Sequence, residues 1–206
     1  HSVWSYGIDV NLTNYTNFVA TQGGFDLGYV DTVLTTGQTN DAAFNFNNVT
    51  NFRLEGLWIA SNGGLSKTVG GNVQEAVNRI GVQLNGCNNG VIRGCTITNH
   101  KYGIRALNSP ASTTSAQMIL IYGNTFLGDT AYDMVYLSCK YIWCEMNFHN
   151  HFPTDYNICE VIGNNCTYIY FVGNSFRRQI NSNAALLNMF SQSSNIILDS
   201  NFYNVN

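Results

Sequence analysis

The chain has 206 residues, which suffices for one domain with a full hydrophobic core, and its many Phe, Tyr, Ile and Leu residues exclude a disordered chain. Nine Lys and Arg against twelve Asp and Glu give a net charge of −3, and only 10% of residues are charged. No basic stripe typical of nucleic-acid-binding proteins occurs, nor does an apolar run of the roughly 18 residues that span a membrane. We therefore expect neither nucleic-acid binding nor membrane insertion.

The composition favours short strands joined by turns. Thirty residues are Asn and nineteen are Gly, whereas Glu and Lys, which favour helices, are scarce. Phe, Tyr, Ile, Val and Thr, which favour strands, are frequent. The sequence thus predicts an all-β protein.

Along the chain, residues 1–42 are predicted to form an irregular N-terminal segment, with a partial coil at 6–12, and residues 43–206 a single domain. Apolar stretches at 43–46, 80–84, 134–137 and 185–189 are expected to be strands. The segment 70–79 is expected to hold a short helix, and 108–115 a loop.

A pattern recurs six times at unequal intervals. Its anchors are Val49, Cys87, Ala116, Cys139, Cys166 and Ser193. Apolar side chains dominate the third and fifth positions after each anchor. In four copies Gly stands at the seventh position, and in four copies Asn stands at the eighth. A large apolar residue then follows, namely Ile59, Ile97, Phe126, Phe148, Phe176 and Phe202.

This spacing has a simple physical meaning. Apolar residues two positions apart indicate a strand with one buried face, and Gly permits the turn that follows. Each copy is therefore about three short strands, which cannot bury their apolar face alone but can do so when copies stack.

The stacked pattern is clearest at residues 166–176, CTYIYFVGNSF. It resembles the right-handed parallel β-helix (pectin-lyase-like) superfamily of pectate lyases, polygalacturonases and viral or phage tailspikes, over residues 43–203. The resemblance implies a single-stranded right-handed parallel β-helix of about six or seven coils. It also implies an internal ladder of stacked turn residues, formed by Asn124, Asn147, Asn174 and Asn201.

The six cysteines lack any CxxC pair, which excludes a zinc ribbon or a thioredoxin motif. We interpret Cys87, Cys139, Cys144 and Cys166 as small buried residues of a narrow core. Neighbouring coils about 4.8 Å apart leave a Cys139–Cys166 disulfide as the alternative. Sequons at Asn11, Asn14, Asn48 and Asn165 argue only weakly for a glycosylated surface protein.

Outward positions of adjacent coils are predicted to form an aromatic patch, made of Tyr122, Tyr141, Trp143, Tyr168 and Tyr170. Exposed patches of this kind mark interfaces or ligand sites. Three interpretations stay open: flat rings that bind sugars, an interface between subunits as in the trimeric tailspikes that the chain resembles, and a surface covered by the chain's own loops.

Glu145 and Asp199 are the candidate catalytic residues. They share one outward column two coils apart, about 9.6 Å at the backbone, and the acid and base of inverting glycosidases lie roughly 6.5–9.5 Å apart. The alternative is two solvated surface acids. In the same column Glu55 and Arg93 are expected to form a surface ion pair.

Motifs of the enzymes in this superfamily are missing from the sequence. The polygalacturonase motifs Asn-x-Asp, Asp-Asp, Gly-His-Gly and Arg-x-Lys do not occur, nor does a compact acidic cluster of the pectate lyase type. His149, His151 and Asp155 have only loose metal-ligand spacing, and a solvated loop is the favoured interpretation. We expect no metal and no cofactor.

The resemblance and the missing motifs together predict an extracellular or virion-surface spike or adhesin module that contacts host or environmental polysaccharide, as a homotrimer. The first alternative is a glycoside hydrolase or polysaccharide lyase, similar to a tailspike depolymerase. The second is a purely structural fibre segment. The last copy has no polar cap, so we expect further chain or another subunit to cover it.

Overall fold

The computed structural model describes residues 8–11, 16–19, 25–26, 42–60, 67–69, 72–74, 80–98, 100, 102–109, 118–127, 132–151, 161–178, 187–189 and 192–205. Within these residues every regular element is a β-strand, as the composition predicts. None of the described segments forms a helix long and apolar enough to cross a membrane.

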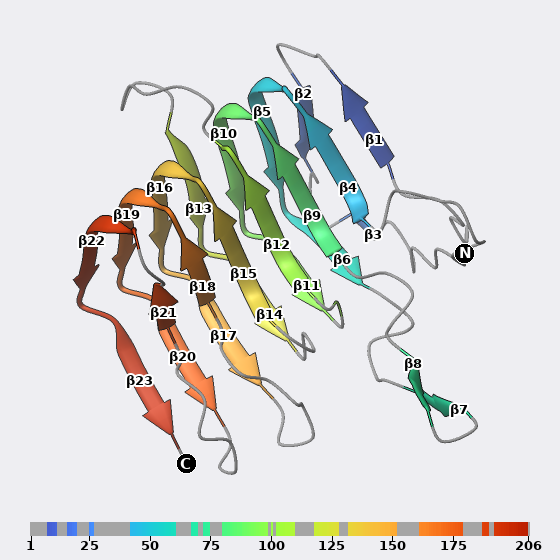
Figure 1. The fold of residues 1–206 in the computed structure, drawn as a ribbon. Coiled ribbons are helices and arrows are strands. Elements are labelled where there is room, and N and C mark those ends of the chain that lie inside the picture. Colours follow the sequence, from blue (N-terminus) through green and yellow to red (C-terminus); the bar gives the residue numbers. More distant parts are fainter. Residues whose placement is uncertain are drawn as a thin grey trace.

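Three parallel sheets of seven strands each make up the fold (Figure 1). The first sheet consists of β1 (Ile8–Asn11), β4 (Ala42–Asn47), β9 (Ile80–Asn85), β12 (Tyr102–Leu107), β15 (Tyr132–Leu137), β18 (Val161–Asn164) and β21 (Leu187–Met189). The middle sheet consists of β2 (Thr16–Val19), β5 (Thr50–Glu55), β10 (Asn88–Arg93), β13 (Ile119–Tyr122), β16 (Lys140–Glu145), β19 (Thr167–Val172) and β22 (Ser194–Asp199). The third sheet consists of β3 (Phe25–Asp26), β6 (Leu57–Ala60), β11 (Thr96–Thr98), β14 (Thr125–Leu127), β17 (Phe148–His151), β20 (Ser175–Arg178) and β23 (Phe202–Val205).

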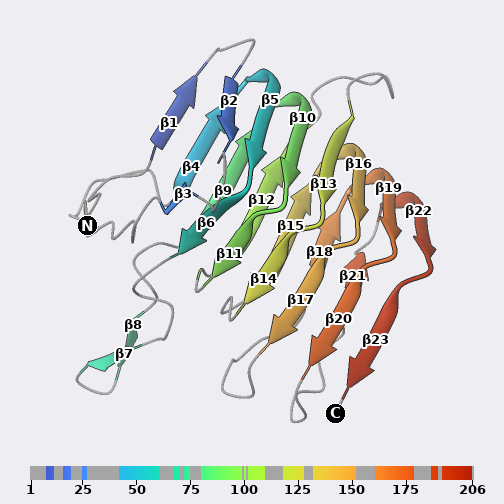
Figure 2. The same cartoon turned by 180° about the vertical axis from the view of Figure 1, so that it is seen from behind.

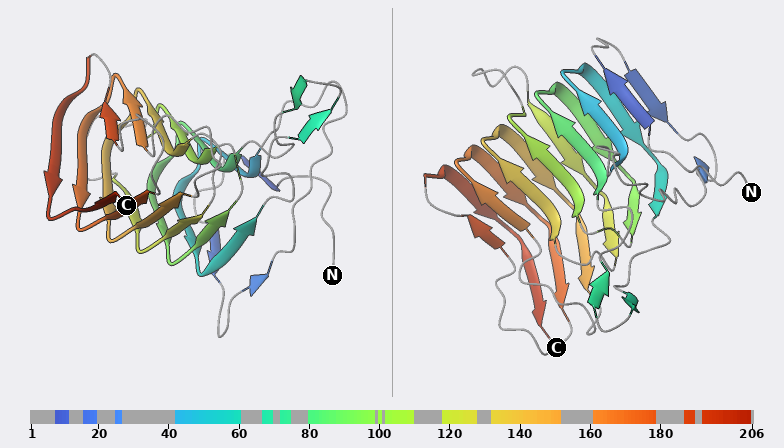
Figure 3. Two further views of the ribbon diagram at one scale, coloured as in Figure 1. Left: turned by 90° about the horizontal axis from the view of Figure 1, so that it is seen from below. Right: turned by 45° about the vertical axis from the view of Figure 1, so that its right-hand side comes forward.

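Apart from β7 and β8, consecutive strands therefore belong to different sheets, and each strand pairs with the strand one full turn later. The chain winds through seven coils, numbered from the first (β1–β3) to the seventh (β21–β23). Figure 3 shows this winding from below in its left view. The parallel β-helix predicted from the sequence is confirmed.

Two regions differ from the regular coils. Strands β1, β2 and β3 pair with the second coil, so the first coil lies within residues 8–26. Figure 2 shows a small antiparallel hairpin beside the coils, formed by β7 (Lys67–Val69) and β8 (Asn72–Gln74). The helix expected at 70–79 is wrong at residues 72–74, where pairing with β7 favours a strand. The remainder of 70–79 lies outside the described residues.

The core is built from columns of like side chains. On the middle sheet, Leu54, Ile92 and Ile121 lie in register on adjacent strands and are fully buried. Cys144 and Phe171 continue the same column on the next two coils. Strands about 4.8 Å apart place each side chain directly on its counterpart, which is why the sequence repeats residue types rather than exact residues.

The predicted asparagine ladder is present at the turn between the middle and third sheets. Nδ2 of Asn124, Asn147 and Asn174 donates to Oδ1 of the Asn one coil later, over 2.9–3.0 Å. The same Nδ2 atoms also donate to backbone carbonyls of the preceding coil. Because each Oδ1 also accepts a backbone N–H from the preceding coil, the turn carries no unpaired amide there.

The cysteines lie where the repeat predicts, as buried free thiols. Cys139 Sγ donates to the Ala106 carbonyl over 3.2 Å, and Cys166 Sγ to that of Tyr136 over 3.3 Å, so the disulfide alternative is not the state observed. The neighbouring Cys139 lowers the pKa of the Cys166 thiol, while burial raises the pKa of Cys139. Cys159 lies outside the described residues.

The predicted repeat is wrong at two kinds of position, the anchor of one copy and the inward residue after the turn in two copies. Ser109, not Ala116, occupies the anchor column, since its Oγ accepts the backbone N–H of Cys87. The segment 110–117 is inserted after the anchor and lies outside the described residues, as does the remainder of the loop expected at 108–115. On the third sheet, His149 and Tyr203 continue the column of Phe126 and Phe176, whereas Phe148 and Phe202 point outward.

Candidate functional site

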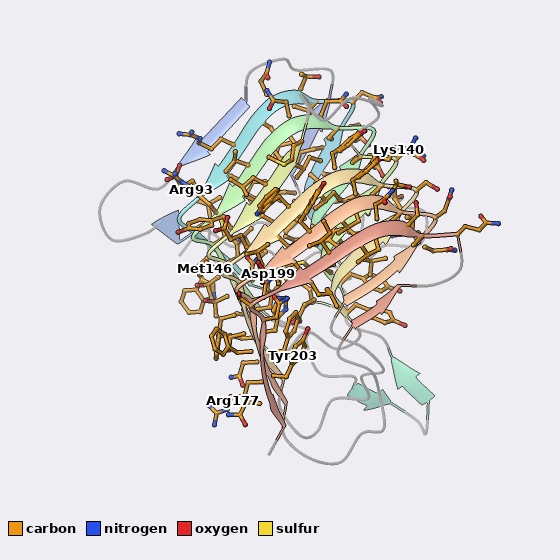
Figure 4. All side chains as sticks on the ribbon, turned by 90° about the vertical axis from the view of Figure 1, so that its left-hand side faces the viewer. Arg93, Lys140, Met146, Arg177, Asp199 and Tyr203 are labelled. Carbon is orange, nitrogen blue, oxygen red and sulfur yellow. The ribbon has the colours of Figure 1, made fainter. Side chains whose placement is uncertain are left out.

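The outer face of the middle sheet carries the residues that the sequence predicts to be functional. Two outward columns run along it. The central column comprises Arg53, Val91, Leu120, Trp143, Tyr170 and Ile197. The edge column, beside the ladder turn, comprises Glu55, Arg93, Tyr122, Glu145, Val172 and Asp199. Figure 4 shows Arg93 and Met146 on one side of the molecule and Lys140 toward the other.

The two candidate carboxylates have the expected register. Glu145 pairs with Val172, and Val172 with Asp199, so the carboxylates are separated by two strand spacings, about 9.6 Å at the backbone. Glu145 is half-buried and Asp199 is exposed, with Asp199 Oδ1 accepting a hydrogen bond from Ser200.

Glu55 forms ion pairs with two arginines at the N-terminal end of this face. Its Oε1 accepts hydrogen bonds from Nε and Nη2 of Arg93, and its Oε2 lies 3.6 Å from Nη1 of Arg53. The predicted Glu55–Arg93 pair is confirmed. With two guanidinium groups and one carboxylate, the cluster keeps one positive charge.

The aromatic side chains lie in stacked pairs rather than flat on the sheet. Trp143 stacks on Tyr170 with centroids 4.7 Å apart and 20° between the planes. Tyr141 stacks on Tyr168 with centroids 4.9 Å apart and 3° between the planes. One face of each ring is thus covered by its partner one coil away. Nε1 of Trp143 is buried without a hydrogen-bond partner in the described part of the chain.

Tyr141 and Tyr168 also adopt a backbone conformation that aromatic residues avoid. Their φ angles are 55° and 58°, while Asn51, Asn89 and Asn195 occupy the same strand position with φ near 50–60° elsewhere. Left-handed conformation costs a residue with a large side chain about 1 kcal/mol, and stacking recovers a comparable amount. The pair therefore combines local strain with ring contact.

Tyr122 differs from the other four aromatic residues of the patch. It lies in the edge column between Arg93 and Glu145, its side chain is 42% exposed, and no ring contact involves it among the described residues. Its side chain is exposed, as the sequence predicts, but the sequence gave no reason to separate it from the stacked rings.

Sequence reasoning missed Trp58, which is 51% exposed on β6 and in register with Thr96 and Thr125. It lies two residues beyond Gly56, on the other side of the ladder turn. The available signal was the alternation itself, because Trp58 separates the inward residues Leu57 and Ile59.

The histidine singled out for metal binding is part of the core. His149 Nδ1 lies 2.7 Å from Asp133 Oδ2, both side chains are buried, and the imidazole stacks between the rings of Phe126 and Phe176. The interpretation of His149 as a solvated loop residue is therefore wrong, because it belongs to β17. Asp155 lies outside the described residues, and within these no group of metal-ligating side chains gathers.

Comparison with known proteins supports the fold. No protein-family model matches the sequence, and no curated protein does. The structure is similar to the crystal structure of alginate lyase from Paenibacillus sp. str. FPU-7, with a TM-score of 0.50 and 13% sequence identity. The match covers 98% of this chain and 78% of that chain, so the likeness extends over nearly all seven coils. At this identity it establishes the shared fold.

Proposed function

We propose that this protein binds an extended polysaccharide on the outer face of the middle sheet. The observation that carries the proposal is the register of this face, where aromatic rings, arginines and carboxylates recur, among aliphatic residues, in two columns along the helix axis. A polymer with a regular repeat can contact such a surface on several coils at once, which raises affinity without a deep pocket. The similarity to an alginate lyase supports a polysaccharide as the ligand.

Affinity electrophoresis tests the proposal. Native gels containing alginate, polygalacturonate or a neutral β-glucan should retard the protein, and soluble oligosaccharides of the same polymer should restore its mobility. The alginate lyase similarity gives alginate priority in this panel. Unchanged mobility in every gel would contradict polysaccharide binding and favour the structural-fibre alternative.

A second candidate function is cleavage of the bound polymer, favoured by the structural similarity and by the spacing of Glu145 and Asp199. Elimination leaves a double bond conjugated to the uronate carboxylate and so raises ultraviolet absorbance, whereas hydrolysis only releases reducing ends. Assaying both products distinguishes the two reactions. Cleavage that Glu145→Gln and Asp199→Asn leave unchanged would show that other residues perform it.

The spike or adhesin role, the homotrimer and the extracellular or virion-surface location stay predictions from the sequence. Light scattering of the purified chain addresses the trimer directly. A monomer that still binds polysaccharide would separate binding from assembly, because the face then needs no second subunit.

A further inference from the structure

The geometry of the outer face narrows the place where a polysaccharide binds. Sugar rings bind aromatic side chains by laying C–H groups on the ring face, where the negative side of the quadrupole lies. Trp143 with Tyr170, and Tyr141 with Tyr168, already cover one face of each ring with the other. These four rings stabilise the sheet surface, and each has at most one face left for a sugar.

Tyr122 keeps its ring accessible for a structural reason. Its neighbour in the edge column, on the third coil, is Arg93. Both Nε and Nη2 of Arg93 form an ion pair with Glu55 of the second coil. The ion pair draws the guanidinium away from the fourth coil, which contains Tyr122. The ring is 42% exposed, and no other described ring packs on it.

The turn beside Tyr122 leaves space for a ligand. Gly94 and Gly123 directly follow Arg93 and Tyr122, with φ of 59° and 60°. A Cβ built on either glycine would have no atom within 4 Å, so the corner is bare over these two coils. On the next coil the exposed side chain of Met146 takes the equivalent position.

Trp58 lies across the same corner. It projects from β6 of the second coil, and Thr96 and Thr125 follow it in register on the third and fourth coils. Along the helix axis, Trp58 and Tyr122 are two strand spacings apart, about 9.6 Å, which is comparable with the length of a disaccharide unit. The two threonine hydroxyls lie along this path and can hydrogen-bond sugar hydroxyls.

We propose that the polysaccharide runs along the helix axis over the corner at Gly94 and Gly123, with sugar rings packed on Tyr122 and Trp58. The proposal rests on the polysaccharide binding proposed above and assigns its contact residues. Arg93, on the third coil between the two rings, can donate to hydroxyl or carboxylate groups of the polymer, and Glu145, on the fifth coil, can accept from hydroxyl groups of the next sugar. Specificity among polymers then depends on this corner rather than on the stacked aromatic pairs.

Affinity electrophoresis of single variants tests the assignment, in whichever of the alginate, polygalacturonate or β-glucan gels retards the wild type most. Tyr122→Ala and Trp58→Ala should each weaken binding about tenfold or more. Phe202→Ala is the matched control, because Phe202 is 68% exposed and outward on the same sheet as Trp58, but on the seventh coil. It should change binding by less than about twofold.

The outcomes separate the two proposals. Tyr168→Ala removes a stacked ring, and a loss of binding there with none in Tyr122→Ala would overturn the corner assignment while polysaccharide binding stands. Failure of every gel to retard the wild type would overturn the proposed function and this assignment together. Unfolding curves of Tyr122→Ala and Trp58→Ala should match the wild type, since both side chains are exposed, so lost binding cannot be attributed to lost fold.

Discussion

At the scale of single residues, Asn174 connects neighbouring coils as extensively as Asn147 does. Its Nδ2 donates to the Cys144 carbonyl and to Oδ1 of Asn201, and its Oδ1 accepts from both the backbone N–H and Nδ2 of Asn147. One amide thus joins three coils. Such a residue resembles a core side chain in its contacts although it is polar.

Replacing Asn174 by Leu should therefore destabilise the fold by about 1–3 kcal/mol, because two donors of Asn147 and the Cys144 carbonyl lose their partner while staying buried. Urea unfolding measures the change. Asn204→Leu, at an exposed position on β23, is the control and should change stability by less than about 0.5 kcal/mol. Equal effects of the two substitutions would show that the ladder contributes nothing specific.

At the scale of the strand, Gly90 shows how neighbouring coils share space. It occupies the inward column between Phe52 and Ile119, where every other described copy has a larger side chain. A Cβ at Gly90 would lie 2.0 Å from ring atoms of Phe52, which is far below contact distance. The phenyl ring of one coil fills the volume that the glycine of the next coil leaves empty.

Gly90→Ala should consequently cost about 1–3 kcal/mol through overpacking. The double variant Phe52→Leu with Gly90→Ala should recover part of this loss, because leucine leaves the space beside residue 90 that the Phe52 ring fills. A thermodynamic cycle of the four proteins in urea measures the coupling. Additive effects would contradict the direct steric contact.

The strands were predictable because alternation and stacking impose the same pattern on every copy. Positions such as Ile121 and Ile142 follow from period two alone, and the ladder follows from Asn after Gly. The sequence did not show that Phe148 and Phe202 point outward, because the residue after each of them, His149 or Tyr203, also carries a ring. The insertion at 110–117 concealed the anchor Ser109. Because it lies between the anchor and the following strand, counting back from that strand leads to Ala116 instead.

The site was less predictable than the fold, for a reason that concerns ring orientation. The sequence places Trp143 and Tyr170 on one outward column but does not reveal whether rings lie flat or stack. Strands about 4.8 Å apart bring aromatic neighbours close to stacking distance, so in-register rings pack on each other before they bind any ligand. A ring with neither face covered by another ring therefore arises where the neighbours in the column are not aromatic, as at Tyr122.

At the scale of the whole molecule, stability depends on each coil covering the next. Leu54 and Leu198 occupy the same inward column, on the second and seventh coils. Leu54 is fully buried, whereas Leu198 is 52% exposed because no described coil lies beyond it. The same residue type at the same position in the repeat thus has two environments. Comparing the loss of stability on truncation of the two leucines therefore shows whether anything covers the last coil in solution.

If the 206-residue chain is uncovered there in solution, Leu54→Ala should cost about 2–5 kcal/mol and Leu198→Ala less than about 1 kcal/mol, since exposed methyl groups lose little on truncation. Urea unfolding at two protein concentrations measures both variants. A cost for Leu198→Ala that approaches that of Leu54→Ala, and that grows with protein concentration, would show that a second copy packs on the seventh coil. A large cost without concentration dependence would instead place a segment of the same chain over Leu198, because intramolecular cover does not dilute.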